Sequence, residues 1–251
     1  MNMSYQDLLR MRERNALRGG MRLHLEQIYA LVHKHIQSSL NLEILELGAG
    51  SGLSRFFLPN LNVLRTDFMN WDQPHVIGGI DAQKLPYKDS SFSAVFGIDV
   101  LHHIQRPLEF LEEALRVLHS GGKIVLIEPF VSFLSYPIYK IFHEERTSWK
   151  LPIDSSIDLV LEDPEDGNQG VSRAFFYDVE GLALLSEHLG RSIRINTTFL
   201  MPFSFFATGG VTNPIGTPRL IIKILQWIED KIPYWILPHI SSRILIVIAK
   251  N

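Results

Sequence analysis

Apolar residues follow two periods along this chain, one typical of helices and one typical of buried strands. Near the start they recur every three or four positions, at Met21, Leu25, Ile28, Val32 and Ile36, which predicts an amphipathic helix. Continuous apolar runs then predict strands near residues 44–47, 61–66, 94–98, 123–128, 192–199 and 243–249. Helical patterns separate most of these runs. This alternation predicts an α/β fold with a doubly wound, mostly parallel sheet and right-handed crossovers.

Two of the helical patterns carry start and stop signals. The helix that starts near Pro107 is predicted to end at Gly121–Gly122 and to present one apolar face, made of Leu108, Leu111, Leu115 and Leu118. A later helix is predicted to begin at the capping residue Asp178 and to end before Gly190, with an apolar face of Leu182, Leu185 and Leu189. Each of these helices lies between two predicted strands, as the helix of a crossover connection does.

The first apolar run leads into the segment 48–52, which contains three closely spaced glycines. Glycine lets the backbone turn sharply and approach a bound molecule, and Leu53–Leu58 then supplies a short helical turn before Pro59. Asp67 follows about 20 residues later, where doubly wound folds place a carboxylate on ribose hydroxyls. The spacing is G-x-G-x-G rather than G-x-G-x-x-G. It therefore favours a cofactor with a ribose but no phosphate, and disfavours an NAD-type oxidoreductase.

Four motifs in this order resemble those of class I S-adenosylmethionine-dependent methyltransferases of the type 11 kind. They are residues 46–52, 79–95, 100–104 and 118–123. The resemblance implies a Rossmann-like sheet of seven strands whose last strand is antiparallel, with S-adenosylmethionine as cofactor. It also implies that Glu46 and the loop (Gly48, Ala49, Gly50, Gly52) hold the methionyl end, that Asp67, followed by Phe68, holds the ribose, and that Asp81 and Ala82 read the adenine edge.

Each of these roles has a plainer alternative. Asp67 is also typical of a turn at the end of a strand, and Asp81 of a residue that begins a turn. Asp99, at the end of the run 94–98, either faces the cofactor or caps the following helix. The cofactor roles are preferred for Asp67 and Asp81, and the two readings of Asp99 remain equal.

Candidates for catalysis are His102, His103, Glu128 and His143. The methyl group of a sulfonium is already activated, so alignment and exclusion of water are expected to do most of the work. An oxygen or nitrogen acceptor can also require a base, and histidine has the most suitable pKa. Packing is the preferred explanation for His102 and His103. His143 is followed by two acidic residues, Glu144 and Glu145, but neighbours on one helix point to different sides, so no metal site is predicted.

The boundaries predicted from these patterns divide the chain into six parts. They are an N-terminal helical segment (1–40), a cofactor-binding half of the core (41–129), a cap insert (130–177, aromatic over 130–150), a core helix and strand (178–200), an apolar cap insert (201–242) and a last strand (243–251). The two inserts are expected to meet over the carboxyl edge of the sheet and to enclose the acceptor.

Composition limits the kinds of molecule that the protein is expected to bind. The chain has 251 residues, a net charge of −3 and no cysteine, which gives no basic footprint for nucleic acid and no disulfide framework. The N-terminus lacks the form of a signal peptide, and a cytoplasmic location is expected. The acceptor is expected to be a small molecule, or a glycan or glycolipid such as a lipid-linked sugar. Most apolar residues of the second insert are expected to pack on each other and on the core. The alternative hypothesis is that some of them line an acceptor pocket or rest on a membrane surface, with Arg219, Lys223 and Lys231 near headgroups. A non-catalytic cofactor-binding subunit is the alternative function, and the oligomeric state is not predicted.

Overall fold

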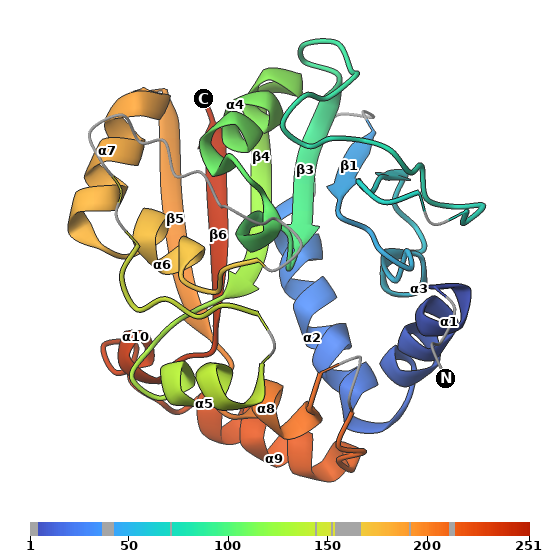
Figure 1. Ribbon diagram of the computed structural model, residues 1–251, viewed down its shortest axis with the longest axis vertical. Helices are drawn as coiled ribbons and strands as arrows, with labels where there is room; N and C mark the ends of the chain where they lie inside the picture. The colour runs from blue at the N-terminus through green and yellow to red at the C-terminus, as the bar shows by residue number, and fades with distance from the viewer. Residues whose placement is uncertain are drawn as a thin grey trace.

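The computed structural model describes residues 5–36, 43–70, 72–143, 145–151, 153, 167–190, 192–210 and 214–251. Its centre is a six-stranded sheet in the order β2-β1-β3-β4-β6-β5 (Figure 1). The strands are β1 (Ile44–Leu47), β2 (Val63–Arg65), β3 (Phe92–Ile98), β4 (Leu118–Pro129), β5 (Ile193–Leu200) and β6 (Arg243–Lys250). The first four are parallel to one another, and β6 is antiparallel to both of its neighbours. The predicted mostly parallel sheet with an antiparallel last strand is confirmed.

The described residues form six strands rather than the expected seven. The segment after β2 makes a single parallel bridge, between Thr66 and Ile77, and then turns. Gly79 adopts a φ of +76°, a conformation that ends an extended strand. Ile77 still donates to the Arg65 carbonyl and Asp67 to the Ile77 carbonyl, both at 2.9 Å, so the segment occupies the edge position of a seventh strand.

Helices cover both faces of this sheet because successive side chains of a strand point to opposite sides. One face carries Leu45, Val95 and Ile124 and packs against α4 (Pro107–Val117), α6 (Val171–Phe176) and α7 (Val179–Leu189). The other carries Ile44, Phe96 and Val125 and packs against α2 (Gly19–Ile36) and α3 (Ser54–Phe57). The five residues predicted as the apolar face of α2 are all buried.

The predicted end of the helix after Pro107 is wrong. α4 ends at Val117, and β4 begins at Leu118 and runs through Gly121 and Gly122. The apolar face is also rotated from the predicted one, because the buried residues of α4 are Pro107, Phe110, Leu111, Ala114 and Val117. A large aromatic side chain at position 110 decides which face turns inward. In α7 the predicted Asp178 and Gly190 boundaries are confirmed, although the Asp178 side chain makes no capping hydrogen bond.

Both inserts lie at the carboxyl edge of the parallel strands. The first contributes α5 (Ser135–Phe142), and the second contributes α8 (Ser204–Thr208), α9 (Arg219–Glu229) and α10 (Leu237–Ile240). These four helices gather below the ends of β3 and β4 (Figure 1). The first insert also reaches the sheet, because α6 packs in the core. Its residues 154–166 lie outside the described part of the chain.

The N-terminal segment consists of α1 (Tyr5–Ala16) and α2, with Gly19 at a φ of +51° between them. α2 reaches the second insert, where Gly20 lies so close to Ile222 of α9 that an added Cβ would be 2.5 Å from its side chain. The helices of the described ranges include none that is both long enough and apolar enough to cross a membrane.

Candidate functional site

The glycine loop leaves β1 and leads into α3. Gly48, Gly50 and Gly52 have φ values of +67°, +52° and +66°, which side chains rarely adopt. A Cβ on Gly48 would lie 2.3 Å from a methyl group of Val100, so this glycine lets the loop pass close to the end of β3. A Cβ on Gly50 would meet no atom within 4 Å, so the loop is open on that side. The prediction that the glycines form a close-approach turn agrees with this geometry.

Glu46, the last polar residue of β1, is buried beneath the loop. Its carboxylate accepts a short hydrogen bond from the Ser54 hydroxyl and lies 3.7 Å from Nε of Arg65. Burial raises the pKa of Glu46 to about 7, against the opposing effects of Ser54 and Arg65. The structure therefore places Glu46 behind the loop, where it holds α3, rather than on the open side.

Asp67, at the end of β2, holds the glycine loop from the other side. Its Oδ2 accepts from the Gly50 amide at 2.7 Å and its Oδ1 from the Met69 amide at 2.9 Å. Phe68, directly after it, is 69% exposed. Each carboxylate oxygen keeps a lone pair for another donor. Asp67 and the loop are therefore brought together as the sequence predicts.

Asp81 and Ala82 lie in the turn that follows the bridged segment. Ile80 donates to the Asp67 carbonyl at 3.0 Å, which brings this turn beside Asp67. Asp81 Oδ1 accepts from the Gln83 amide at 2.9 Å, the contact expected of a turn-forming aspartate.

Asp99 pairs with a buried arginine that the sequence analysis did not consider. Nη1 of Arg243, the first residue of β6, lies 2.5 Å from Asp99 Oδ1. The Arg243 side chain is 2% exposed and the Asp99 side chain 46%. Burial alone lowers the pKa of Arg243, but the Asp99 carboxylate outweighs it and raises that pKa. Arg243 was detectable as a cation directly before the apolar run 244–249.

Asp99 has a φ of +58° and ties the end of β3 to the cap, since Arg243 also lies over the Phe205 ring at 4.9 Å. Neither predicted reading of Asp99 covers this ion pair. The helix after β3 is only the single turn η1 (Leu101–His103), and its N-terminal amides are held by Glu128 instead.

Glu128, at the end of β4, is fully buried and acts as a clamp. Its Oε1 accepts from the amides of Val100 and Leu101, each at 2.9 Å, and its Oε2 lies 2.7 Å from His102 Nδ1. The predicted packing role of His102 agrees with this arrangement. Glu128 has no exposed surface, so it positions η1 and does not reach solvent.

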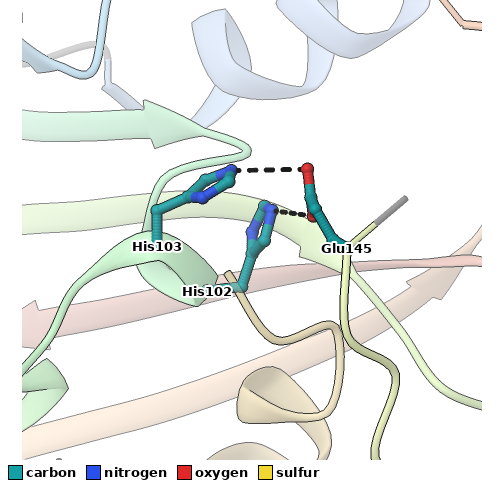
Figure 2. A group of neighbouring side chains, drawn as sticks. All are labelled: His102, His103 and Glu145. Atoms are coloured by element: carbon teal, nitrogen blue, oxygen red, sulfur yellow. Dashed lines mark ion pairs between the residues drawn. The ribbon is translucent and has the colours of Figure 1, made fainter. Parts of the chain in front are cut away.

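The far side of His102 meets a second carboxylate, Glu145 (Figure 2). Glu145 Oε2 lies 3.3 Å from Nε2 of His102, and its Oε1 lies 3.7 Å from Nε2 of His103. Burial alone lowers the pKa of His102, but the two glutamates outweigh it and raise that pKa. Burial alone raises the pKa of Glu145, but the hydrogen bond to His102 and the nearby imidazoles lower it below its ordinary value.

His143 and Glu145 converge for a reason that the sequence analysis missed. It assumed that both residues continue one helix and so diverge. α5 ends at Phe142 instead, and His143 has an extended backbone. His143 Nδ1 consequently lies 3.9 Å from Glu145 Oε2. Glu144 lies outside the described residues.

One further residue, Arg55, links the glycine loop to α1. Its Nη1 donates to the carbonyls of Ser51 and Gly52 at 2.6 and 2.8 Å, and its Nη2 lies 2.6 Å from the Glu13 carboxylate. In the sequence, only its position three residues after the last loop glycine indicated that Arg55 contacts the loop.

Residues 45–126, which carry the loop, Asp67, Asp81 and Asp99, match the methyltransferase-domain family. The predicted resemblance to methyltransferases is confirmed over this segment, and it agrees with the predicted cofactor, S-adenosylmethionine. A solved S-adenosylmethionine-dependent methyltransferase from Archaeoglobus fulgidus has the same fold, with a TM-score of 0.52 at 16% identity, covering 92% of this chain and 94% of that one.

Two relatives with named activities are similar to parts of this chain. A tRNA U34 carboxymethyltransferase of Pseudoalteromonas atlantica is 30% identical over 113 residues, which are 38% of this chain and 34% of the relative. A fatty-acid O-methyltransferase of Mycolicibacterium smegmatis is 37% identical over 124 residues, 44% of this chain and 43% of the relative. The chain thus spans less than half of either relative, and their named acceptors differ.

The donor set of the methyltransferase loop fits S-adenosylmethionine. The open side of Gly50 leaves room for a molecule close to the backbone, since an added Cβ would meet no atom within 4 Å. Asp67 offers carboxylate lone pairs beside it, and the Asp81 turn lies next to Asp67. A cofactor with a ribose and an adenine requires these acceptors and backbone groups in this order.

Proposed function

We propose that the protein transfers a methyl group from S-adenosylmethionine to a small molecule or a lipid-linked sugar that is presented at a membrane surface. The observation that carries the methyl-transfer part is the open glycine loop tied to Asp67 within residues 45–126. The acceptor part rests on the cap.

The cofactor supplies a methyl group on a positively charged sulfur, already activated for attack. The protein then has to align the acceptor and exclude water. We assign Glu46, Gly48, Ala49, Gly50 and Gly52 to shaping the cofactor loop, Asp67 and Phe68 to the ribose side, Asp81 and Ala82 to the adenine side, and Asp99 to the edge nearest the cap.

Of the four histidine and glutamate candidates, we propose different roles for the buried and the exposed pair. His102 and Glu128 hold each other and the amides of η1, so we propose them as positioning residues. His103 and His143 are more than a third exposed, and we propose that the acceptor is activated on their side of the cluster. This pair is the one that can exchange a proton with an incoming molecule.

The proposed acceptor enclosure is supported by direct contacts between the two inserts. The Tyr139 ring of α5 lies 6.4 Å from Phe205 and 5.4 Å from Phe206 of α8, centroid to centroid. The Tyr139 hydroxyl donates to the Ser242 carbonyl at 2.6 Å. The inserts therefore hold each other over the carboxyl edge of the sheet, next to the proposed cofactor loop.

The proposed membrane contact rests on the orientation of α9. Its inner side, with Ile222 and Glu229, is buried. Its outer side presents exposed apolar residues, including Ile224 at 48% and Trp227 at 64%, and Tyr234 and Trp235 follow at 84% and 64%. Arg219, Lys223 and Lys231 occur along the same stretch. Aromatic and aliphatic side chains flanked by cations are typical of helices that lie in the interface of an anionic membrane.

The relatives allow a choice between acceptor classes. One is named for fatty acids, which agrees with an apolar acceptor at a membrane. Another is named for tRNA. The net charge of −3 favours the first class, since nucleic-acid binding relies on Lys and Arg that neutralise phosphates.

Calorimetry tests the cofactor assignment. The purified full chain is titrated with S-adenosylhomocysteine and, separately, with NAD. We expect saturable binding of the first and none of the second. Binding of NAD alone would overturn the methyltransferase function and return the chain to the oxidoreductase class.

Vesicle sedimentation tests the membrane contact. The full chain is mixed with vesicles of phosphatidylcholine, alone or with phosphatidylglycerol. We expect binding only to the anionic vesicles, reduced about 10-fold in Trp227→Ser because a large apolar side chain no longer enters the interface. The matched control is Val179→Ser on α7, an apolar residue that is even more exposed (85% against 64%) and lies away from the cap. Equal binding of both variants would contradict the assignment to α9.

A further inference from the structure

The convergence of His102, His103 and Glu145 brings three metal-ligating side chains from two separate segments to one point. The two histidines are consecutive residues of η1, and their ring centroids lie 4.2 Å apart. The carboxylate arrives from the loop after α5. One nitrogen of each imidazole and one carboxylate oxygen all lie within 4.8 Å of one another. Figure 2 shows both rings directed at the carboxylate.

We propose that these three residues bind a divalent transition-metal ion of the zinc type. A tetrahedral ion with bonds of about 2.0–2.2 Å to nitrogen and oxygen holds its ligand atoms about 3.4 Å apart. Nε2 of His102 lies 3.3 Å from Oε2 of Glu145, and Nε2 of His103 lies 3.7 Å from Oε1, both close to that value. With a single carboxylate oxygen the three ligand atoms lie within 4.8 Å of one another, so the ion has to draw them slightly together. Two imidazoles and one carboxylate are a donor set suited to zinc, cobalt or iron rather than to magnesium or calcium.

The environment of His102 supplies an independent argument. Glu128 also accepts from two backbone amides, so its oxygens act as acceptors and the Nδ1 of His102 carries the proton between them. Nε2 of His102 then faces the oxygens of Glu145, so either a second proton, which the raised pKa of His102 favours, or a metal ion lies between them. A carboxylate that fixes a histidine through Nδ1 is the usual support of a metal-bound imidazole.

The remaining ligand is also supported from outside. The Gln169 side chain donates a short hydrogen bond to Glu145 Oε2. Gly167 has a φ of +59°, and a Cβ there would lie 2.8 Å from Nδ1 of His103. Residues 167–169 therefore lie against His103 and hydrogen-bond to Glu145. The Asn168 amide also donates to the His102 carbonyl at 2.8 Å.

Three protein ligands leave a position for a further molecule, the arrangement found in catalytic rather than structural zinc sites. His143, 3.9 Å from the same carboxylate, borders that position. An ion here would join the loop after α5 to η1 and could polarise an oxygen bound to it. The binding itself does not depend on the proposed methyl transfer.

Metal titration of the full chain without an affinity tag tests the inference. The protein is stripped with a chelator and dialysed, and then titrated with Zn²⁺ in competition with a chromogenic chelator. We expect one high-affinity equivalent, an increase in the unfolding temperature, and absorption bands of tetrahedral cobalt when Co²⁺ replaces Zn²⁺. Glu145→Gln and His103→Ala should each weaken the binding about 100-fold or more, because each removes a ligand. His103 is partly exposed, so its variant is expected to fold even if others fail.

The matched control is the exposed pair formed by His188 and Glu112, whose Nε2 and Oε1 lie 2.8 Å apart without a second histidine. His188→Ala should leave the affinity unchanged. Absence of saturable binding, or equal affinity in all variants, would show an imidazolium–carboxylate network and overturn the inference. Titration with S-adenosylhomocysteine on the same samples separates this outcome from failure of the proposed function, since that ligand is assigned to the glycine loop.

Discussion

The cofactor-binding half and the cap distribute apolar side chains in opposite ways. In β1, β3 and β4 nearly every apolar residue is buried. The buried carboxylates of these strands each have a partner, Ser54 for Glu46 and His102 for Glu128. In the cap, α9 buries Ile222 and Glu229 and turns Ile224 and Trp227 outward. The first half thus buries its apolar side chains within this chain, whereas α9 leaves several of its own exposed.

The inner side of α9 provides the largest expected effect. Ile222 is fully buried where α9 passes close to Gly20 of α2. Ile222→Ala should lower the free energy of unfolding by about 2–4 kcal/mol, the usual cost of a cavity left by a buried isoleucine. Urea denaturation measures this value. A loss below that range would mean that the cap is only loosely attached to α2.

The junction between the two halves depends on the ion pair of Asp99 and Arg243. Asp99→Ala leaves a buried guanidinium without its carboxylate, so unfolding should become easier by about 2–3 kcal/mol, somewhat less than for a fully buried pair because Asp99 is half exposed. Asp89→Ala, which removes a mostly exposed partner of Arg116, is the control and should cost at most about 1 kcal/mol. Equal losses would show that the junction is no stronger than a surface contact.

Within the cofactor half, Asp67 is expected to act on binding rather than on stability. Asp67→Ala removes charge-assisted hydrogen bonds that contribute about 1.5–3 kcal/mol. The affinity for S-adenosylhomocysteine should therefore fall about 10- to 100-fold. Calorimetry measures the change and circular dichroism checks the fold. An unchanged dissociation constant would leave Asp67 as a loop-supporting residue only, through its bond to Gly50.

The buried Glu46 of the cofactor half predicts that the free energy of unfolding depends on pH. Burial raises its pKa to about 7 in the folded protein, whereas the unfolded chain has the ordinary value of 4.5. The folded state therefore holds an extra proton between these values, and this contribution to stability is lost as the pH rises through about 7. Glu46→Gln should remove that loss and be more stable than the parent at pH 8 by about 1–2 kcal/mol.

Denaturation curves from pH 4 to pH 8 test the Glu46 prediction. The exposed Glu187→Gln variant on α7 is the control and should follow the parent at every pH. A Glu46→Gln curve parallel to that of the parent would show that Arg65 and Ser54 keep the carboxylate ionised throughout.

The sequence predicted most of the cofactor half because local signals decide its structure. Glycine spacing, strand-end carboxylates and continuous apolar runs all depend on neighbours in the chain, and the sheet order and the contact of Asp67 with the loop agree with them. The missing seventh strand, where Gly79 has a positive φ, and the rotated face of α4, where Phe110 is buried, were not predicted from these local patterns.

The contacts that join the cap to the core could not be predicted in the same way. Arg243 and Asp99 are 144 positions apart, and Glu145 meets His102 only because α5 stops at Phe142. Such pairs are decided by how the inserts return to the sheet. The sequence analysis named His102, His103 and His143 but did not anticipate that one carboxylate would bring them together.

The outer face of α9 provides the smallest expected effect on stability. Ile224→Ala changes a side chain that is 48% exposed and lies only two residues after Ile222. Since it leaves no cavity, the free energy of unfolding should change by no more than about 0.5 kcal/mol. The same variant should nevertheless weaken binding to anionic vesicles, because its apolar surface is the part assigned to the membrane. Measured together with Ile222→Ala, this pair separates the two sides of one helix. A stability loss as large as that of Ile222→Ala would mean that Ile224 is covered by this chain itself, and the outward orientation of the cap would then need another explanation.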